Sequence, residues 1–220
     1  MFEFSIMRKI LNKFFLIFIF PISVFSQEND FQTWTSISAS KKIIKKTNLI
    51  VKQGARFREN SSLYSKLFTD LKIKSKYNKH FSFAIGYRFS NDWDKQLELS
   101  QKNRFYSDIY YKDKYKKRFL FDARARLQTQ GNIEGYAATF RHKSALAYNI
   151  QKTKLEPSVA LEYFLPFESM LIDKLRYTIG LSHPITKDLD AEIAYRIQQE
   201  FYTNNPETLF IFEGKLSYDF

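Results

Sequence analysis

Oily and polar side chains alternate along many short stretches of this chain, and this period of two constrains the fold more than any other feature. In residues 81–89 the odd positions are aromatic or branched, whereas the even positions are small or charged. The alternation recurs in residues 119–128, 155–165, 174–182 and 189–198. Successive side chains of a strand point to opposite faces, so each stretch predicts a β-strand with one oily and one polar face.

The chain ends on a strand of the same kind, which stops at an aromatic residue. Its oily face consists of Phe210, Phe212, Leu216, Tyr218 and Phe220. The other face is mostly polar but also carries Leu209 and Ile211. An oily strand that ends the chain on an aromatic residue resembles the closing strand of an outer-membrane β-barrel, with Leu216, Tyr218 and Phe220 as the closing residues.

Residues 1–26 have the organisation of a secretory signal peptide: three basic residues precede an apolar run over residues 14–24, and cleavage is expected before Gln27. A membrane anchor is the alternative. The run is shorter than the roughly 20 apolar residues of a spanning helix, and Pro21 interrupts it. Residues 27–220 suit a single domain, which we expect in the outer membrane.

The predicted fold is all-β, a single transmembrane, antiparallel, up-and-down β-barrel of about 10–12 strands. Candidate strands begin near Phe31, Thr47, Leu63, Phe81, Leu97, Tyr115, Tyr136, Thr153, Leu175, Leu189 and Thr208. Single-chain bacterial barrels normally have an even strand number and both termini on the periplasmic side, so we expect 10 or 12 strands. Short turns are expected at one end, at 76–79, 113–114, 151–152 and 186–188, with longer connections at the other.

A soluble periplasmic β-barrel that binds a hydrophobic ligand is the alternative fold, with its oily faces turned inward. Five or more bulky side chains per strand would crowd a small interior. Large aromatic residues near strand ends, among them Trp34 and Phe164, suit the interface girdles of a membrane barrel.

The charge balance is basic, with a formal net charge of +12. An exported chain rarely meets nucleic acid, so lipid phosphate or anionic glycan is a better-placed partner for this charge. The favoured interpretation is that the basic residues belong to solvated Lys-rich turns. The chain contains no Cys, which excludes disulfides and thiolate chemistry.

Residues 31–220 resemble the uncharacterised outer-membrane β-barrel family known as domain of unknown function 2490. The resemblance is carried by Trp34 and by the segments 124–128, 156–164, 176–181, 194–198 and 216–220. It implies an outer-membrane location and no particular activity.

If the oily faces meet lipid, charges of both signs line the lumen. These are Arg56, Arg88, Asp122, Arg124, Arg126, Glu156, Glu162, Arg176, Asp190, Glu192 and Arg196. One interpretation is a network that pairs and fills the barrel interior. The other is a narrow channel for a small, possibly anionic solute.

His142 and Ser144 share a face of one candidate strand with Phe140 and Leu146, so they lie on the predicted lipid side. A His-activated Ser there would make a lipid-acting esterase. The sequence His142-Lys143-Ser144-Ala145 lacks the Asp, Asn and Gly that surround such a pair in outer-membrane phospholipases, and Asn149 is predicted on the opposite face. We therefore predict no enzyme.

The predicted function is a structural or ligand-binding role at the cell envelope, with a charge-filled lumen. We expect a monomer that contacts outer-membrane lipid and requires the barrel-insertion machinery for assembly. No cofactor, metal site or nucleic acid is expected, since His80 and His183 stand apart from other ligand residues.

Overall fold

The computed structural model describes residues 28–116 and 118–220, and this part of the chain forms eleven β-strands. The predicted signal peptide, 1–26, lies outside the described residues. The strands are β1 (Glu28–Ile44), β2 (Thr47–Arg58), β3 (Leu63–Lys76), β4 (Phe81–Trp93), β5 (Leu99–Tyr115), β6 (Phe119–Asn132), β7 (Gly135–Tyr148), β8 (Glu156–Pro166), β9 (Lys174–Pro184), β10 (Leu189–Glu200) and β11 (Glu207–Asp219). In the described ranges no helix is long and apolar enough to cross a membrane.

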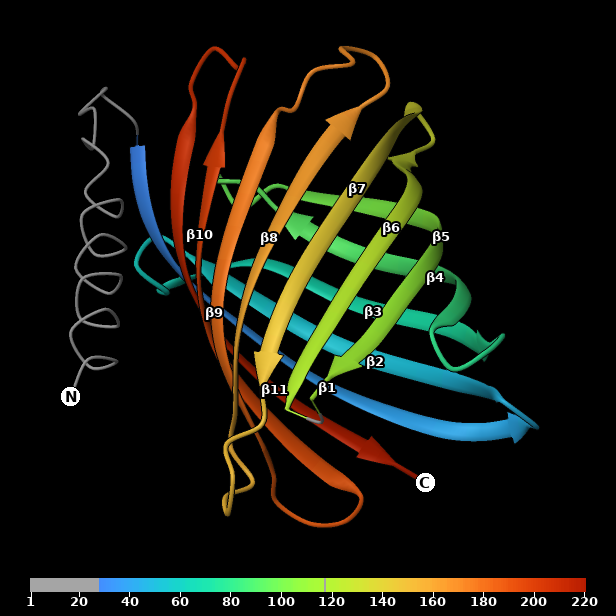
Figure 1. Cartoon of the computed structure of the whole chain (residues 1–220). Helices are drawn as coiled ribbons and strands as arrows, with labels where there is room; N and C mark the ends of the chain where they lie inside the picture. Colours follow the sequence, from blue (N-terminus) through green and yellow to red (C-terminus); the bar gives the residue numbers. More distant parts are fainter. Residues whose placement is uncertain (1–27, 117) are drawn as a thin grey trace, which may run out of the picture.

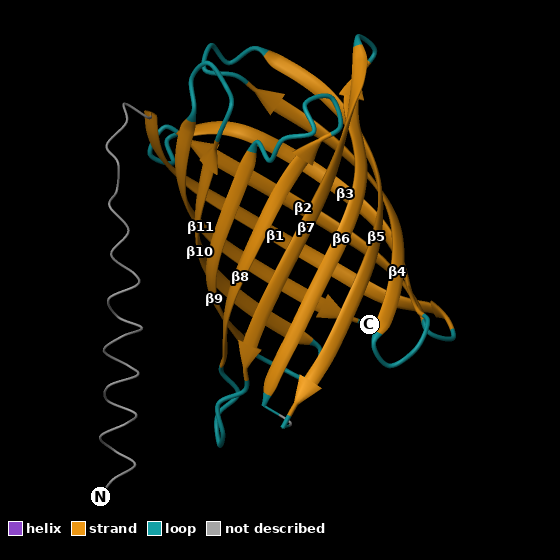
Figure 2. Cartoon of the chain, turned by 45° about the horizontal axis from the view of Figure 1, so that its top comes forward, coloured by secondary structure: helices purple, strands orange, loops and turns teal. Residues whose placement is uncertain are grey.

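The strands form one closed barrel, which confirms the predicted all-β barrel (Figures 1 and 2). Consecutive strands pair as antiparallel hairpins, but the closing pair of β1 and β11 is parallel, with Phe31 opposite Phe210 and Ser40 opposite Asp219. The expectations of an even strand number and of antiparallel pairing throughout were wrong. Each hairpin reverses the chain, so the eleventh strand runs in the same direction as the first and closes on it in parallel.

The start of β1 and the end of β11 consequently lie at opposite ends of the barrel, and not at the same end as expected (Figure 1). We call the end that holds Phe220 the C-terminal rim and the other end the N-terminal rim. The N-terminal rim carries the connections 59–62, 94–98, 133–134, 167–173 and 201–206. The expected separation of short and long turns is incomplete, because the short connection 133–134 lies at the rim with the longer loops. The turn predicted at 113–114 falls inside β5, since pairing with β6 continues to Tyr115 opposite Phe119.

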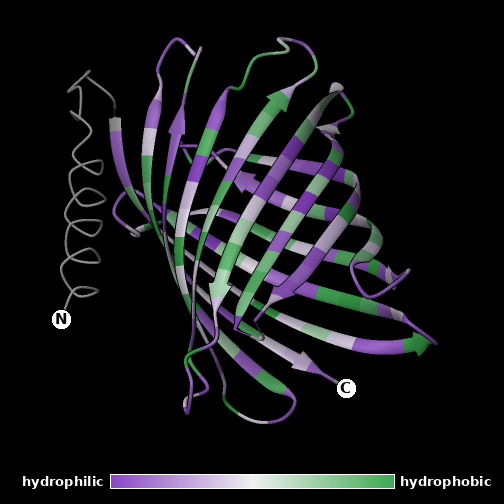
Figure 3. Cartoon of the chain, in the orientation of Figure 1, coloured by the Kyte–Doolittle hydropathy of each residue, from purple (hydrophilic) through white to green (hydrophobic). Residues whose placement is uncertain are grey.

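The two faces of the barrel wall differ in chemistry. Figure 3 shows hydrophobic and hydrophilic residues alternating along the strands. Outward side chains such as Ile85, Phe105 and Ile193 are 63%, 50% and 52% exposed, whereas the inward Asp108 and Glu162 are 1% and 4% exposed. This arrangement, with apolar residues outside and charges inside, is the one expected if the oily faces of the strands turn outward. It is opposite to that of a lipocalin-like barrel, whose oily face turns inward.

A small apolar cluster lies at the β1–β11 seam and consists of Trp34, Leu209 and Ile211. Ile211 is fully buried, and the Trp34 indole Nε1 donates to Gln32 Oε1 at 2.9 Å. This cluster explains why two apolar residues stand on the polar face of the last strand. Trp34 and Phe164 are buried lining residues of the interior cavity and not the girdle residues expected from the sequence.

The predicted closing residues stand at the same seam. Leu216 and Tyr218 are exposed on the outer face, and the Phe220 ring contacts that of Tyr218 at 4.6 Å between centroids. The Phe220 backbone N–H donates to the Ser40 carbonyl at 2.8 Å. The last residue therefore fastens the end of β11 to β1.

Candidate ligand site in the barrel lumen

The barrel encloses a cavity of about 1120 Å³, lined by side chains from all eleven strands. It begins at the N-terminal rim, where Asn60 and Lys95 take part in the lining, and extends inward to Lys72, Lys143 and Lys215. Its volume is slightly above the range of roughly 300–1,000 Å³ found for small-molecule sites. The cavity is therefore the candidate binding site of this fold.

The cavity lining is rich in positive charge, with seventeen Lys and Arg side chains against ten Asp and Glu. The basic residues are Lys52, Arg56, Arg58, Lys66, Lys72, Arg88, Lys95, Lys102, Arg104, Arg124, Arg126, Arg141, Lys143, Lys174, Arg176, Arg196 and Lys215. The acidic residues are Asp30, Glu59, Asp70, Asp92, Asp94, Glu98, Glu162, Asp173, Glu207 and Glu213. The lumen thus favours an anion over a cation.

On the wall formed by β3–β6, each buried carboxylate binds one guanidinium and one phenol. Asp70 accepts from Arg88 Nε at 2.8 Å and from the Tyr106 hydroxyl at 2.6 Å. Asp108 accepts from Arg126 Nε at 2.6 Å and Nη2 at 2.8 Å, and from the Tyr110 hydroxyl at 2.7 Å. We call these six side chains the paired wall: Asp70, Arg88, Tyr106, Asp108, Tyr110 and Arg126. Its charges cancel locally.

Glycine makes room for the aromatic members of this side of the lumen. A Cβ on Gly86 would lie 2.2 Å from Tyr106 Cζ, and a Cβ on Gly54 would lie 2.3 Å from Phe68 Cζ. Both rings lie directly over a neighbouring backbone. The Tyr106 hydroxyl reaches Asp70 only because position 86 has no side chain.

On the wall formed by β6–β9, a single carboxylate serves three guanidinium groups. Glu162 lies 2.5 Å from Arg124 Nη2, 2.8 Å from Arg141 Nη2 and 3.0 Å from Arg176 Nη1. We call these four residues the Glu162 cluster. Because one negative charge stands against three positive ones, the cluster keeps an excess of positive charge inside the lumen.

Ring faces hold several of the buried guanidinium groups. Arg56 Cζ lies 3.6 Å from the centre of the Trp34 ring, and Arg126 Cζ lies 3.8 Å from that of Tyr106. Arg141 and Arg176 lie 4.3 Å and 4.9 Å from the centre of the Phe164 ring. A cation over an aromatic face is stabilised without losing its charge, so these rings position the cations and leave their charge available.

The predicted lumen residues fall into two groups, of which the first lines the cavity. Arg124, Glu162 and Arg176 meet in the Glu162 cluster; Arg88 and Arg126 belong to the paired wall. Arg196 forms an ion pair with Glu213, and Arg56 stacks on Trp34.

The second group lies nearer the C-terminal rim and is absent from the lining of the described cavity. Asp122 lies 3.2 Å from Lys112 Nζ, and Glu192 lies 2.7 Å from Lys215 Nζ. Glu156 begins β8 and accepts a hydrogen bond at its backbone carbonyl from Ser182, and Asp190 is an exposed residue near the start of β10. The structure therefore does not gather all the predicted charges into one network.

Several residues of the cavity lining were missed by the sequence analysis, notably Asp70, Arg104, Arg141 and Glu213, and so was the buried Asp108 beside them. The signal was present, since Tyr106, Asp108 and Tyr110 alternate with Phe105, Ser107 and Ile109 along β5. Aromatic residues occupy both faces there. The alternation of apolar and polar residues therefore does not show which face of β5 points inward.

His142 and Ser144 lie on the outer face of β7, with His142 Nε2 and Ser144 Oγ 3.0 Å apart. The imidazole also contacts the Tyr163 ring at 5.5 Å between centroids. Among the described residues, neither an acid nor an amide hydrogen bonds to this imidazole, and Asn149 instead donates its backbone N–H to Arg118. In residues 28–116 and 118–220, no group of three or more His, Cys, Asp or Glu residues is placed to hold a metal ion.

No protein of curated function matches the chain. The family model described as "Protein of unknown function (DUF2490)" matches residues 31–208, which include all of β2–β10, most of β1 and the start of β11. The matched range covers both walls of the cavity and most of the chain, so this protein belongs to the DUF2490 family.

Proposed function

We propose that this protein is an outer-membrane β-barrel whose lumen binds a small solute that enters at the N-terminal rim. The arrangement of the two faces carries the proposal: an exposed apolar exterior surrounds a buried, charged interior. In this proposal the partners are outer-membrane lipid on the exterior and the barrel-insertion machinery during assembly, and the barrel is a monomer.

Strand length and surface chemistry support the membrane location. The described strands are 11 to 17 residues long, and a tilted strand needs roughly 9–11 residues to cross a bilayer. Outward aliphatic and aromatic side chains such as Ile85 and Phe105 would stand in water if the barrel were soluble. In a bilayer the same side chains contact hydrocarbon, so the free-energy cost of exposing them to water disappears.

Cysteine labelling tests the membrane placement, because the chain has no native Cys. Ser100 and Ser107 lie on opposite faces of β5: Ser100 lines the cavity, while Ser107 stands between the outward Phe105 and Ile109. In outer-membrane fragments, a water-soluble maleimide should label Ser100→Cys and leave Ser107→Cys unmodified until the membrane is dissolved. Equal labelling of both variants, or recovery of the protein in the soluble fraction, would contradict the proposal.

Heat modifiability provides an independent measurement on the same membranes. A folded membrane barrel migrates differently on a cold gel before and after boiling, and we expect this shift for the native chain. Deletion of Phe220 removes the ring contact with Tyr218 and the backbone hydrogen bond to Ser40, so the shifted band should be lost. A shift that survives the deletion would show that the last residue is dispensable for closure.

A solute channel is a second candidate, favoured by the small inward side chains beyond the cavity. Ser158, Gly180 and Ala194 adjoin one another on β8–β10, so this part of the wall carries only small side chains. A channel predicts stepwise conductance in planar bilayers with preference for anions, which Arg124→Ala should reduce. If the protein produces no conductance in planar bilayers, the channel is excluded and ligand binding in the cavity remains the proposed function.

We assign no catalytic role to the outward His142–Ser144 pair. The imidazole hydrogen bonds to Ser144 and packs on Tyr163, and no described group orients its second nitrogen. Fatty-acid release from phospholipid vesicles should be the same for the native protein and for Ser144→Ala. A loss of release in that variant would establish an esterase instead.

A further inference from the structure

Three guanidinium groups of the cavity stand apart from the ion pairs of the lumen. No carboxylate of the described residues lies within ion-pair distance of Arg56, Arg58 or Arg104. Arg104 donates from Nε to the neutral Gln130 Oε1 at 2.7 Å, and Arg56 stacks on Trp34. Arg58 Nε and Nη2 are buried and have no hydrogen-bond partner.

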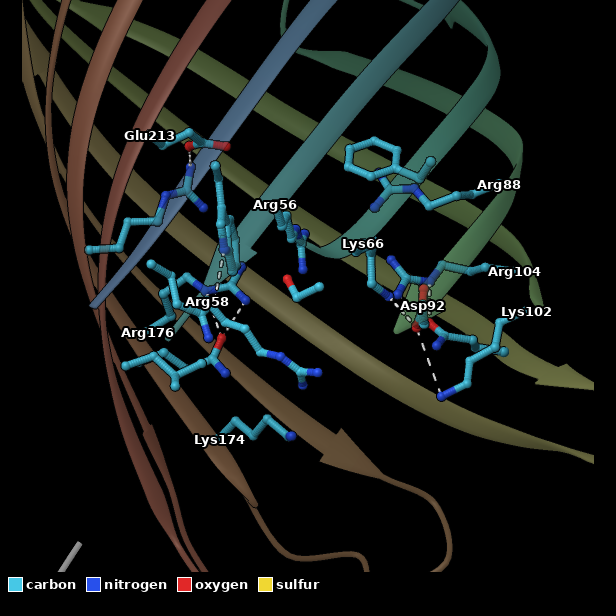
Figure 4. Close-up of a pocket in the computed structure, with 18 of the residues that line it drawn as sticks. Arg56, Arg58, Lys66, Arg88, Asp92, Lys102, Arg104, Lys174, Arg176 and Glu213 are labelled. Atoms are coloured by element: carbon cyan, nitrogen blue, oxygen red, sulfur yellow. Dashed lines mark hydrogen bonds and ion pairs between the residues drawn. The ribbon is translucent and has the colours of Figure 1, made fainter. Parts of the chain in front are cut away.

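These groups come from two strands, β2 and β5, and face the same cavity. Figure 4 shows Arg56 and Arg58 reaching into the cavity from β2, and Arg104 reaching toward it from β5. Their surroundings are mostly positive, because Arg56 interacts electrostatically with three arginines, Arg88, Arg104 and Arg176, and with one carboxylate, that of Glu213. Lys66 and Lys102 lie nearby and share the carboxylate of Asp92.

This arrangement is costly unless an anion completes it. A buried cation without a partner loses hydration and gains no ion pair in return. The same lumen neutralises Arg88 and Arg126 with one carboxylate each, so carboxylates are supplied where the fold requires them. Near Arg56, Arg58 and Arg104 no carboxylate of the described chain is close enough to form an ion pair, and the nearby Asp92 is already shared by Lys66 and Lys102.

We propose that Arg56, Arg58 and Arg104 form the binding site for a small organic anion that carries two or more phosphate or carboxylate groups. Guanidinium forks match the oxygens of both groups, and several forks around one cavity select a ligand with more than one anionic group. The cavity volume of about 1120 Å³ admits such a molecule and not a large polymer. The inference rests on the proposed function and identifies the ligand chemistry of its lumen.

The test measures binding to the full barrel by calorimetry, in detergent, at constant ionic strength. Pyrophosphate and citrate are the two polyanionic probes, and acetate is the monoanionic control. We expect saturable binding of at least one polyanion, roughly tenfold or more tighter than acetate. Pyrophosphate alone would identify a phosphate ligand, and citrate alone a polycarboxylate.

Matched arginine variants locate the site. Arg104→Gln and Arg58→Gln should each weaken polyanion binding roughly tenfold, because each loses a charged hydrogen-bond donor. Arg58→Gln costs the fold no hydrogen bond at Nε or Nη2, since neither atom has a partner. Arg118→Gln is the control: Arg118 also binds neutral partners, Tyr148 and Gln151, but it is exposed outside the cavity.

The shift on boiling is recorded for every sample. It tests the membrane barrel independently of the polyanion site, so failure of one proposal can be told from failure of the other. A barrel that shifts on boiling but binds neither polyanion more tightly than acetate would overturn this inference and leave the membrane barrel intact. Equal weakening by Arg118→Gln would also overturn it, because the effect would then be one of total charge. A native protein without a heat shift would contradict the proposed function, whatever its affinity for anions.

Discussion

The paired wall and the Glu162 cluster solve the same problem of buried charge in different ways. In the paired wall, Asp70 and Asp108 each bind one arginine and one tyrosine. In the Glu162 cluster, one carboxylate lies between three arginines. The first region is close to neutral, whereas the second is positive.

The difference separates side chains that hold the barrel together from side chains that are available to a ligand. A guanidinium bound to its own carboxylate, as Arg126 is to Asp108, has little charge left for a solute. Arg124, Arg141 and Arg176 share one charge and retain most of theirs. Their excess adds to that of Arg56 and Arg104 in the same cavity.

The largest effect should follow from Glu162→Gln, which leaves three buried cations without their common partner. Breaking one buried ion pair costs about 3–5 kcal/mol, and here three cations are affected, so we expect the upper end, about 5 kcal/mol. The measurement is the urea unfolding midpoint of the barrel in lipid vesicles, followed by the heat shift. A loss below about 1 kcal/mol would mean that water already screens this cluster.

Asp108→Asn should cost less, about 3 kcal/mol, because one arginine and one tyrosine lose a charged acceptor. The double variant Asp108→Asn with Arg126→Gln should recover part of this loss, since no buried charge remains unpaired. Adding Arg124→Gln to Glu162→Gln should recover less, because Arg141 and Arg176 stay unpaired. Equal recovery in the two double variants would contradict the distinction between the regions.

Gly86→Ala tests the packing of the paired wall and not its charge. The new Cβ would lie 2.2 Å from the Tyr106 ring, which must move and lose its hydrogen bond to Asp70. Overpacking of this kind costs about 1–3 kcal/mol. Gly214→Ala is the control, because a Cβ there meets no atom within 4 Å; its unfolding midpoint should stay close to the native one.

The sequence predicts the wall of the barrel better than its contents. The alternation predicted the outward faces of β4, β6 and β8–β10, because the outward positions share one property over a whole strand. Three aromatic side chains face inward although aromatic residues mark the outward face elsewhere: Trp34, Phe164 and Tyr106. Their rings contact guanidinium groups in the lumen. Period two carries no information about such pairs, which depend on register between strands far apart in the chain.

The odd strand number was not predicted either, because it also depends on contacts between strands far apart in the chain. Eleven candidate strands were visible, and the expectation of an even number overrode the count. At the parallel seam Trp34 of β1 packs with Leu209 and Ile211 of β11, and these residues meet only in the folded barrel. The presence of two apolar residues on the polar face of the last strand was the available hint.

The smallest effect should come from the ion pair of Lys112 and Asp122 near the C-terminal rim, outside both regions. Their Nζ and Oδ2 atoms lie 3.2 Å apart, but half of the Lys112 side chain is exposed. Exposed pairs contribute about 0.2–1 kcal/mol, so Lys112→Gln should shift the unfolding free energy by about 0.5 kcal/mol or less, and less still in high salt. A loss as large as that of Asp108→Asn would show that charge pairs stabilise this barrel irrespective of burial, and the contrast between the paired wall and the rim would no longer hold.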